Sequence, residues 1–198
     1  TTRSKEDYLK NIYHMQEEGG KVNTGNLAAA LSISPASVSE MVNKLSKEGL
    51  IDNKPYHGFE LTGNGRKISL NLIRKHRLLE VFLHEHLNYE WDEVHQEAEG
   101  LEHVCSDMFI NKLEMYLGYP KFDPHGDPIP DKELNLAPTH YKLLLNTEPG
   151  MEYTIAKVKD SSIEILQYLT KIGIKLNSKI TLNEKIEFDG SVVITAEG

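Results

Sequence analysis

The chain has 198 residues, of which 39% are hydrophobic and 26% are charged, and its formal net charge is −8. This length suffices for one large domain or for two to three small ones, with the hydrophobic content of an ordinary globular protein. No run of about 18 apolar residues is present, which excludes a membrane-spanning helix, and the single cysteine excludes an internal disulfide framework. Without a signal-peptide core at its N-terminus, the protein is expected to be cytoplasmic.

Basic residues are concentrated in the first part of the chain. Residues 1–77 hold 12 Lys and Arg against 8 Asp and Glu, whereas residues 78–198 carry a net charge of −12. A basic head that contacts DNA and an acidic body that binds cations would have this distribution. An excess of four positive charges is a weak indication by itself, so the assignment depends on the motifs of the head.

Apolar periodicity in the first 45 residues predicts three short helices. Residues 4–15 form an apolar stripe behind Ser4, a candidate N-cap. Residues 26–31 are rich in alanine, which permits close packing, and residues 32–45 follow with Pro35 at the first helical position. A short helix, a tight turn and a second helix are typical of a helix-turn-helix.

The second helix of this pair has the composition of a recognition helix. Its apolar positions face a core, which leaves small, hydroxyl-bearing and charged residues outward, where they can bond to phosphates and read base edges. The alternative, a surface helix of any small α-helical domain, stays open. The candidate DNA-contacting residues are Ser34, Pro35, Ala36, Ser37, Ser39, Glu40 and Lys44.

A β-hairpin is predicted after the helix-turn-helix. Residues 49–54 and 59–62 have strand character and are separated by a Pro-Tyr-His-Gly turn. A hairpin in this place would be the wing of a winged helix, with Lys54 and His57 near its tip as candidate phosphate contacts. Each of the two, taken alone, fits a solvated surface residue better than a contact.

Two further segments carry histidine and glutamate at helical spacing. The first, residues 74–84, places His76 and Glu80 four residues apart. The second, expected to be one helix over residues 94–107, presents two imidazoles and two carboxylates within roughly a third of a turn. Like charges at this spacing are unfavourable unless a cation lies among them, so a divalent metal site is predicted, with a solvated acidic face as the alternative. The residues of the second segment are His95, Glu99, Glu102 and His103.

Both segments also carry apolar faces that so small a helical region cannot enclose by itself. Leu78 and Phe82 belong to the first face, and Val104, Met108 and Phe109 to the second. We therefore expect an isologous homodimer. Dimerisation would space two recognition helices ~34 Å apart, so that they meet successive major grooves.

The last third of the chain begins with a proline-rich segment and continues with strand and helix patterns. Five of the eight prolines fall in residues 119–138, which reads as an irregular connector. Residues 153–158 alternate like a strand, residues 161–171 resemble a short helix, and residues 179–194 predict a hairpin around Asp-Gly.

Two motifs in the histidine-bearing segments resemble a known family. Lys-His-Arg-Leu-Leu-Glu at residues 75–80 and Val-His-Gln-Glu-Ala-Glu-Gly-Leu-Glu-His-Val-Cys-Ser-Asp at residues 94–107 closely resemble the diphtheria-toxin-repressor family of metal-dependent transcriptional repressors, especially its manganese-sensing branch. The resemblance implies an α+β, mainly α-helical fold. Its expected parts are a winged helix-turn-helix in residues 1–73, a helical dimerisation and metal-binding domain in residues 74–138 with a proline-rich linker from 119, and a small SH3-like (FeoA-like) β-barrel in residues 139–198.

The resemblance also implies the ligands of a primary metal shared between the first helix and the later one. Oxygen ligands stand at two positions, Asp7 and Glu99, where iron-responsive members have sulfur, and hard carboxylates favour Mn²⁺. Fe²⁺, Zn²⁺, Co²⁺ or Cd²⁺ are expected to substitute in vitro. The implied ligands are Asp7, Glu99, Glu102 and His103, with His76 alongside.

A second metal site is implied as well, although with an open ligand set. Lys10 stands where some manganese regulators have a glutamate that helps to form a binuclear cluster, and an ammonium group cannot ligate. Asp160 is nearly as consistent with a helix N-cap as with a ligand. The candidates for the second site are Glu80 with His76 or His95, joined by Asp123, His125 and Asp160 from farther along the chain.

The function predicted from the sequence is that of a homodimeric, manganese-responsive repressor of metal-uptake genes, which binds operator DNA and has no catalytic activity and no small-molecule substrate. An iron- or zinc-responsive repressor of the same fold is one alternative, and a winged-helix regulator that senses an organic ligand is another. A metal-dependent hydrolase is the third, but nothing in the sequence suggests a substrate pocket for it.

Overall fold

The computed structural model of the chain describes residues 2–54, 58–159 and 162–196. Its described part divides into two compact units. The first unit comprises Thr1–His76, Glu102–Cys105 and Pro130–Asn135, and the second comprises Arg77–Leu101, Ser106–Ile129 and Leu136–Gly198. The predicted domain limits stay predictions, because the two units are defined by contacts and combine separate stretches of chain.

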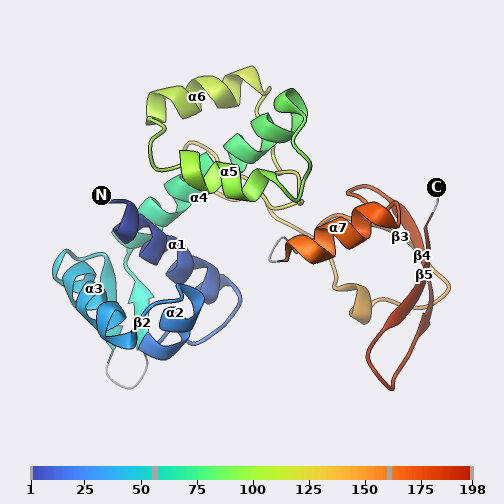
Figure 1. The fold of residues 1–198 in the computed structure, drawn as a ribbon, viewed down its shortest axis with the longest axis horizontal. Coiled ribbons are helices and arrows are strands. Elements are labelled where there is room, and N and C mark those ends of the chain that lie inside the picture. The colour runs from blue at the N-terminus through green and yellow to red at the C-terminus, as the bar shows by residue number, and fades with distance from the viewer. Residues whose placement is uncertain (1, 55–57, 160–161, 197–198) are drawn as a thin grey trace. The chain divides into compact units, whose positions relative to one another are not determined.

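The first unit is a helix-turn-helix followed by a β-hairpin (Figure 1). Its side chains converge on a core formed by α1, α2, α3 and the hairpin, which includes the fully buried Leu9, Leu27 and Leu45. The predicted order of elements is confirmed. The bounds are α1 (Arg3–Glu17), α2 (Thr24–Ala30), α3 (Pro35–Lys47), β1 (Ile51–Lys54), β2 (Gly58–Leu61) and the start of α4 (Gly63–Leu87).

Local capping chemistry explains where these helices begin. Ser34 is the N-cap of α3 and accepts a hydrogen bond from the backbone N–H of Ser37, with Pro35 at the first helical position as predicted. Asn23 caps α2 in the same way. The predicted cap of the first helix was wrong: α1 begins one residue before Ser4, with Thr2 in the N-cap position and no side-chain cap bond.

Gly58 is required by the close approach of the hairpin to the loop before α2. Its φ is +89°, and a Cβ there would lie 2.0 Å from the carbonyl oxygen of Val22, which accepts a hydrogen bond from Phe59 N–H. Gly58→Ala should therefore lower the free energy of unfolding by about 3 kcal/mol in urea denaturation. Gly63→Ala, where no described atom lies within 4 Å, should change it by roughly 0.5 kcal/mol or less, and equal effects would contradict the prediction.

The predicted single helix over residues 94–107 was wrong. The second unit contains α5 (Val94–Leu101) and α6 (Asp107–Tyr116), and a turn of the chain separates them. Gly100 weakens helix propensity at the end of α5, and Ser106 starts a new helix by accepting a hydrogen bond from Phe109 N–H. Glu102 and His103 consequently lie in the turn, where a helical projection does not describe them.

The C-terminal part of the second unit is a small antiparallel sheet with one helix, as predicted (Figure 1). The strands pair in the order β3, β4, β5, and the Asp189-Gly190 turn joins the last two. Trp91 Nε1 donates to Thr170 Oγ1 of α7 at 2.7 Å, which ties this helix to the segment before α5. The bounds are η1 (Leu144–Asn146), β3 (Glu152–Thr154), α7 (Ile163–Lys171), β4 (Lys179–Lys185) and β5 (Val192–Ala196). No helix in the described ranges is long and apolar enough to cross a membrane.

Candidate metal centre

Three predicted ligands come together in the first unit. Asp7 is on α1, and Glu102 and His103 are in the turn after α5, with one ligand atom of each within 4.8 Å of the others. We call these three residues the first cluster. Glu102 is fully buried and His103 is largely so, so the donor atoms are gathered at a site from which most solvent is excluded.

The ring of His103 is oriented with one nitrogen toward the carboxylates of the first cluster. Its Nδ1 lies 2.7 Å from a carboxylate oxygen of Glu6, which can only accept, so Nδ1 carries the proton in the neutral imidazole. Nε2 lies 2.9 Å from Asp7 Oδ1 and 3.3 Å from Glu102 Oε1, yet has no hydrogen-bond partner among the described residues. A lone pair facing two carboxylate oxygens is unfavourable unless a cation lies among them.

Glu102 is held in place by two further groups. Lys10 Nζ lies 2.9 Å from both of its oxygens, and His76 Nδ1 lies 2.5 Å from Oε2. Burial opposes ionisation of Glu102, but the bonds to His76 and Lys10 outweigh it and lower the pKa of this carboxyl. For Asp7, burial dominates and raises the pKa, although the neighbouring His103 acts in the opposite direction.

A separate group of predicted ligands forms a second cluster in the second unit: Glu80 of α4 with Asp123 and His125 of the connector. One ligand atom of each again lies within 4.8 Å of the others, and all three residues are buried. His125 and Glu80 are 0% and 1% exposed, which is rare for titratable groups unless they are paired or bind a metal.

His125 has the same arrangement as His103, with one nitrogen engaged and one free. Its Nε2 lies 2.7 Å from the carbonyl oxygen of Trp91, which accepts only, so Nε2 donates and the lone pair of the neutral ring is on Nδ1. Nδ1 is buried, lies 3.9 Å from Glu80 Oε2, and has no hydrogen-bond partner in the described part of the chain. A carbonyl that fixes the tautomer of a ligating histidine is typical of metal sites.

The turn that carries Asp123 and His125 is fixed by hydrogen bonds on both sides. Asp123 Oδ1 accepts from the backbone N–H groups of His125 at 2.8 Å and Asp127 at 2.9 Å. Arg77 donates to the Pro128 carbonyl and to Asp127 Oδ1. From the C-terminal part, Lys157 donates to Asp127 Oδ1 at 2.6 Å, and Val158 N–H donates to the His125 carbonyl.

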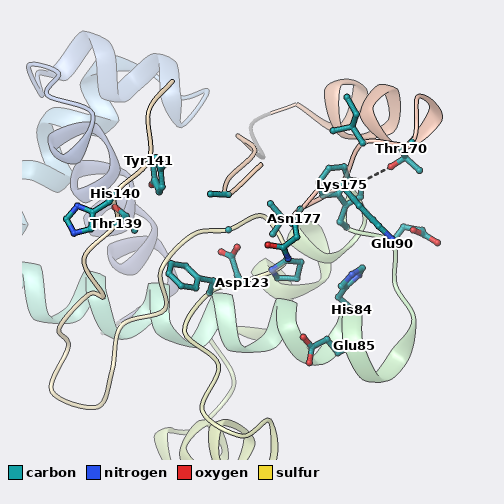
Figure 2. Close-up of a pocket in the computed structure, with 18 of the residues that line it drawn as sticks. His84, Glu85, Glu90, Asp123, Thr139, His140, Tyr141, Thr170, Lys175 and Asn177 are labelled. Atoms are coloured by element: carbon teal, nitrogen blue, oxygen red, sulfur yellow. Dashed lines mark hydrogen bonds between the residues drawn. The ribbon is translucent and has the colours of Figure 1, made fainter. Parts of the chain in front are cut away.

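Asp123 stands apart electrostatically from an ordinary aspartate. Burial, followed by the negative charge of Glu80, raises its pKa to about 7, against the opposing effect of Arg77. Asp123 also lines a cavity of about 830 Å³, together with His84, Tyr141 and Asn177 (Figure 2). Because Asp123 lines this cavity, the cavity gives ions and water an approach to the second cluster.

Other predicted ligands lie outside these two clusters. Glu99 is exposed on α5, and His95 is exposed with its Nδ1 3.5 Å from Glu80 Oε1. His76 is buried and bonds to Glu102. Asp160 lies outside the described residues.

All predicted DNA-contacting residues at the start and along the outer face of α3 are exposed. Part of their hydrogen-bonding capacity is used locally, since Ser34 caps the helix and Ser39 Oγ donates to the Pro35 carbonyl. His57 lies outside the described residues, and so does the side chain of Lys54. That these residues contact DNA stays a prediction.

Sequence reasoning missed the residues that orient the ligands. Glu6 and Lys10 act on residues more than 90 positions away, and Arg77, Asp127 and Lys157 join three separate segments. Their spacing along the chain carries no signal of these contacts. The adjacent acidic pair Glu6-Asp7 on the first helix is the one local hint.

A winged helix-turn-helix and buried carboxylate–histidine clusters, whose inward imidazole nitrogens have no hydrogen-bond partner in the described ranges, define a metal-dependent DNA-binding regulator. The chain matches the description "Iron dependent repressor, N-terminal DNA binding domain" over residues 1–59 and "Iron dependent repressor, metal binding and dimerisation domain" over residues 62–131. It matches a FeoA domain over residues 142–198. The chain belongs to the iron-dependent repressor family. This is the same family as the diphtheria-toxin-repressor family, which the two sequence motifs resemble.

The sequences and structures of similar proteins match this chain over almost its full length. The iron-dependent repressor IdeR of Mycobacterium leprae is 31% identical over 205 residues, covering 98% of this chain and 88% of that protein. A solved manganese-dependent transcriptional repressor in complex with manganese is 38% identical with a TM-score of 0.90, covering 96% of this chain and 89% of that one. ScaR with bound Cd²⁺ is 37% identical with a TM-score of 0.85, covering 98% and 91%.

Family membership confirms the fold class and the predicted function of a metal-dependent transcriptional repressor with a DNA-binding domain and a metal-binding and dimerisation domain. Members of this family are transcriptional repressors and not enzymes, which removes the hydrolase alternative. The match to a metal-binding domain of this family also favours a metal over an organic ligand as the signal.

Proposed function

We propose that this repressor is activated by Mn²⁺ bound to Asp7, Glu102 and His103, and that it binds operator DNA as a homodimer in the cytoplasm, where it controls metal-uptake genes. The observation that carries the proposal is the buried Nε2 of His103, which lies close to two carboxylate oxygens without a hydrogen-bond partner in the described residues. The first cluster fits a divalent cation because its atoms supply two anionic oxygens and one imidazole lone pair.

The donor set supports manganese over softer metals. Two of the three first-cluster ligands are carboxylates, and the second cluster likewise combines two carboxylates with one imidazole. Hard oxygen ligands suit Mn²⁺, although the intrinsic affinity order still ranks Co²⁺ and Zn²⁺ above it, so cellular availability contributes to selection. Solved structures of this fold named for manganese, cadmium and zinc support the same range of metals.

An exposed apolar face on α6 supports the homodimer. Met108 and Met115 are 75% and 51% exposed, and Phe109 and Tyr116 on the same helix are 47% and 65% exposed. So large an apolar surface on one ten-residue helix is typical of an interface. The α6 residues also fall inside the match to the family's dimerisation domain.

The proposed activation operates through the residues that hold the first cluster together. Without metal, the carboxylates of Asp7 and Glu102 repel each other. A divalent cation held by Asp7, Glu102 and His103 would offset this repulsion, and these three residues would then hold α1 to the turn after α5. Since α1 packs in the core with the recognition helix α3, this restraint lowers the ordering cost of DNA binding. Operator DNA should tighten metal binding by the same factor.

The remaining predicted residues complete the proposal. Glu80, Asp123 and His125 would hold a second metal, with Glu99 as a further ligand of the first and His76, His95 and Asp160 as supporting groups. Ser34 to Ser37, Ser39, Glu40 and Lys44 would contact the major groove, and Lys54 and His57 the backbone. Because the second cluster lies beside the bonds from Lys157 and Val158, its metal would stabilise the contact with the C-terminal part.

Fluorescence-anisotropy titration tests the proposal directly. Labelled operator DNA is titrated with the full chain in chelator, and then with Mn²⁺, Fe²⁺ or Zn²⁺ under reducing conditions. We expect Mn²⁺ to tighten DNA binding ten-fold or more, about 1.4 kcal/mol or above of coupling. Equal affinity in chelator and in Mn²⁺ would contradict the proposed activation.

A further inference from the structure

A buried lysine contacts the carboxylate of the first cluster. Lys10 is on α1, one turn after Asp7, and is only 8% exposed. Its Nζ lies 2.9 Å from both oxygens of Glu102 and 3.3 Å from His76 Nδ1. Carboxylate oxygens and an imidazole nitrogen around one ammonium group are the surroundings of a bound cation.

This ammonium group and an incoming metal would share one carboxylate. Glu102 Oε1 lies 2.9 Å from Lys10 Nζ and 3.3 Å from His103 Nε2, the nitrogen that faces the first cluster. A charge of +1 so close to a divalent ion is strongly repulsive at the low effective dielectric of a buried site. The same ammonium group orients the Glu102 carboxylate, because Lys10 donates hydrogen bonds to both of its oxygens.

We propose that Lys10 is a built-in cation of the first cluster that holds Glu102 ready for the metal and, by its charge, weakens divalent-metal affinity, thereby setting the metal concentration at which the repressor loads. Lys10 is a positioning residue that acts through Glu102. The inference rests on the proposed metal site at the first cluster.

The charge of Lys10 can be separated from its packing by three substitutions. Lys10→Arg keeps the charge, Lys10→Gln removes the charge but keeps a hydrogen-bond donor, and Lys10→Met removes both. Lys5→Met is the matched control, because Lys5 is on the same helix and its ion pair is with Glu48, outside the cluster. Lys5→Met also removes one positive charge from α1, but from a lysine that pairs with Glu48 instead of Glu102.

Mn²⁺ affinity is measured on the full-length variants by calorimetric titration at constant pH, and the first-cluster site is identified as the one lost in His103→Gln. We expect Lys10→Gln and Lys10→Met to bind Mn²⁺ there at least five-fold more tightly than the unsubstituted protein, and Lys10→Arg and Lys5→Met to stay within two-fold. Unchanged or weaker binding in both Gln and Met variants would overturn the proposal.

Thermal unfolding supplies a second readout. Loss of the ion pair should lower the melting temperature of the metal-free Lys10→Met protein, and saturating Mn²⁺ should raise it by more than in the unsubstituted protein. A merely structural lysine would lower both melting temperatures equally, which would count against the proposal. If the unsubstituted protein has no Mn²⁺ site that His103→Gln removes, the proposed function itself fails, whatever the Lys10 series shows.

Discussion

Metal-activated DNA binding should be lost when either of two first-cluster ligands, His103 or Glu102, is replaced by glutamine. In His103→Gln the lone pair on Nε2 disappears, whereas the ion pair of Lys10 with Glu102 stays intact. In Glu102→Gln the anionic oxygens shared by Lys10 and the metal disappear. Since loss of outer partners alone typically lowers metal affinity 10- to 100-fold, we expect each ligand substitution to weaken Mn²⁺ binding by roughly 100-fold or more.

The measurement is operator binding by anisotropy at fixed Mn²⁺, with calorimetry for the metal itself. Glu97→Gln is the matched control, because Glu97 is an exposed glutamate of α5 and should leave both quantities unchanged. Glu102→Gln leaves a buried lysine without its counter-charge and is expected to be less stable, so His103→Gln decides the result. Full Mn²⁺ activation in His103→Gln would exclude the first cluster as the activating site.

Metal binding at the second cluster should depend steeply on pH because of Asp123. Its pKa of about 7 means that below neutrality a proton must leave before a metal can bind. We expect Mn²⁺ affinity there to fall about ten-fold for each pH unit below 7 on account of this group. Calorimetric titration between pH 5.5 and 8 measures the slope.

The same shift predicts the stability of the metal-free protein. A carboxyl whose pKa is higher in the folded than in the unfolded state stabilises the fold at low pH, and this contribution is lost as pH rises through about 7. Asp123→Asn isolates the group: its Mn²⁺ affinity should be far below that of the unsubstituted protein at pH 8 and should approach it at pH 5.5. A constant ratio across this range would show that Asp123 does not titrate there.

Local chemistry in the sequence was sufficient for the DNA-binding head. Asn23, Ser34 and Pro35 mark helix starts by hydrogen bonds or fixed φ angles within three residues, and the Pro-Tyr-His-Gly sequence that ends at Gly58 predicted the hairpin. The break in the predicted helix over residues 94–107 was missed because periodicity does not register two local signals, Gly100 near the end of α5 and the N-cap Ser106 before α6. A helical projection placed Glu102 and His103 on one face with His95 and Glu99. In the structure, Glu102 and His103 lie in the turn, whereas His95 and Glu99 are exposed on α5.

The sequence by itself determined the kinds of donor present, the helix-turn-helix and, through its two motifs, the family of metal-dependent repressors. Helix caps, apolar periodicity and ligand chemistry depend on near neighbours, which the order of residues records. The family resemblance implied that Asp7 shares a metal with His103 and that Asp123 and His125 join Glu80, but only the tertiary structure decided that their donor atoms converge and that Lys10 lies against Glu102. Those pairings join residues 43 to 96 positions apart along the chain, and they arise from packing of whole segments, which no local pattern specifies.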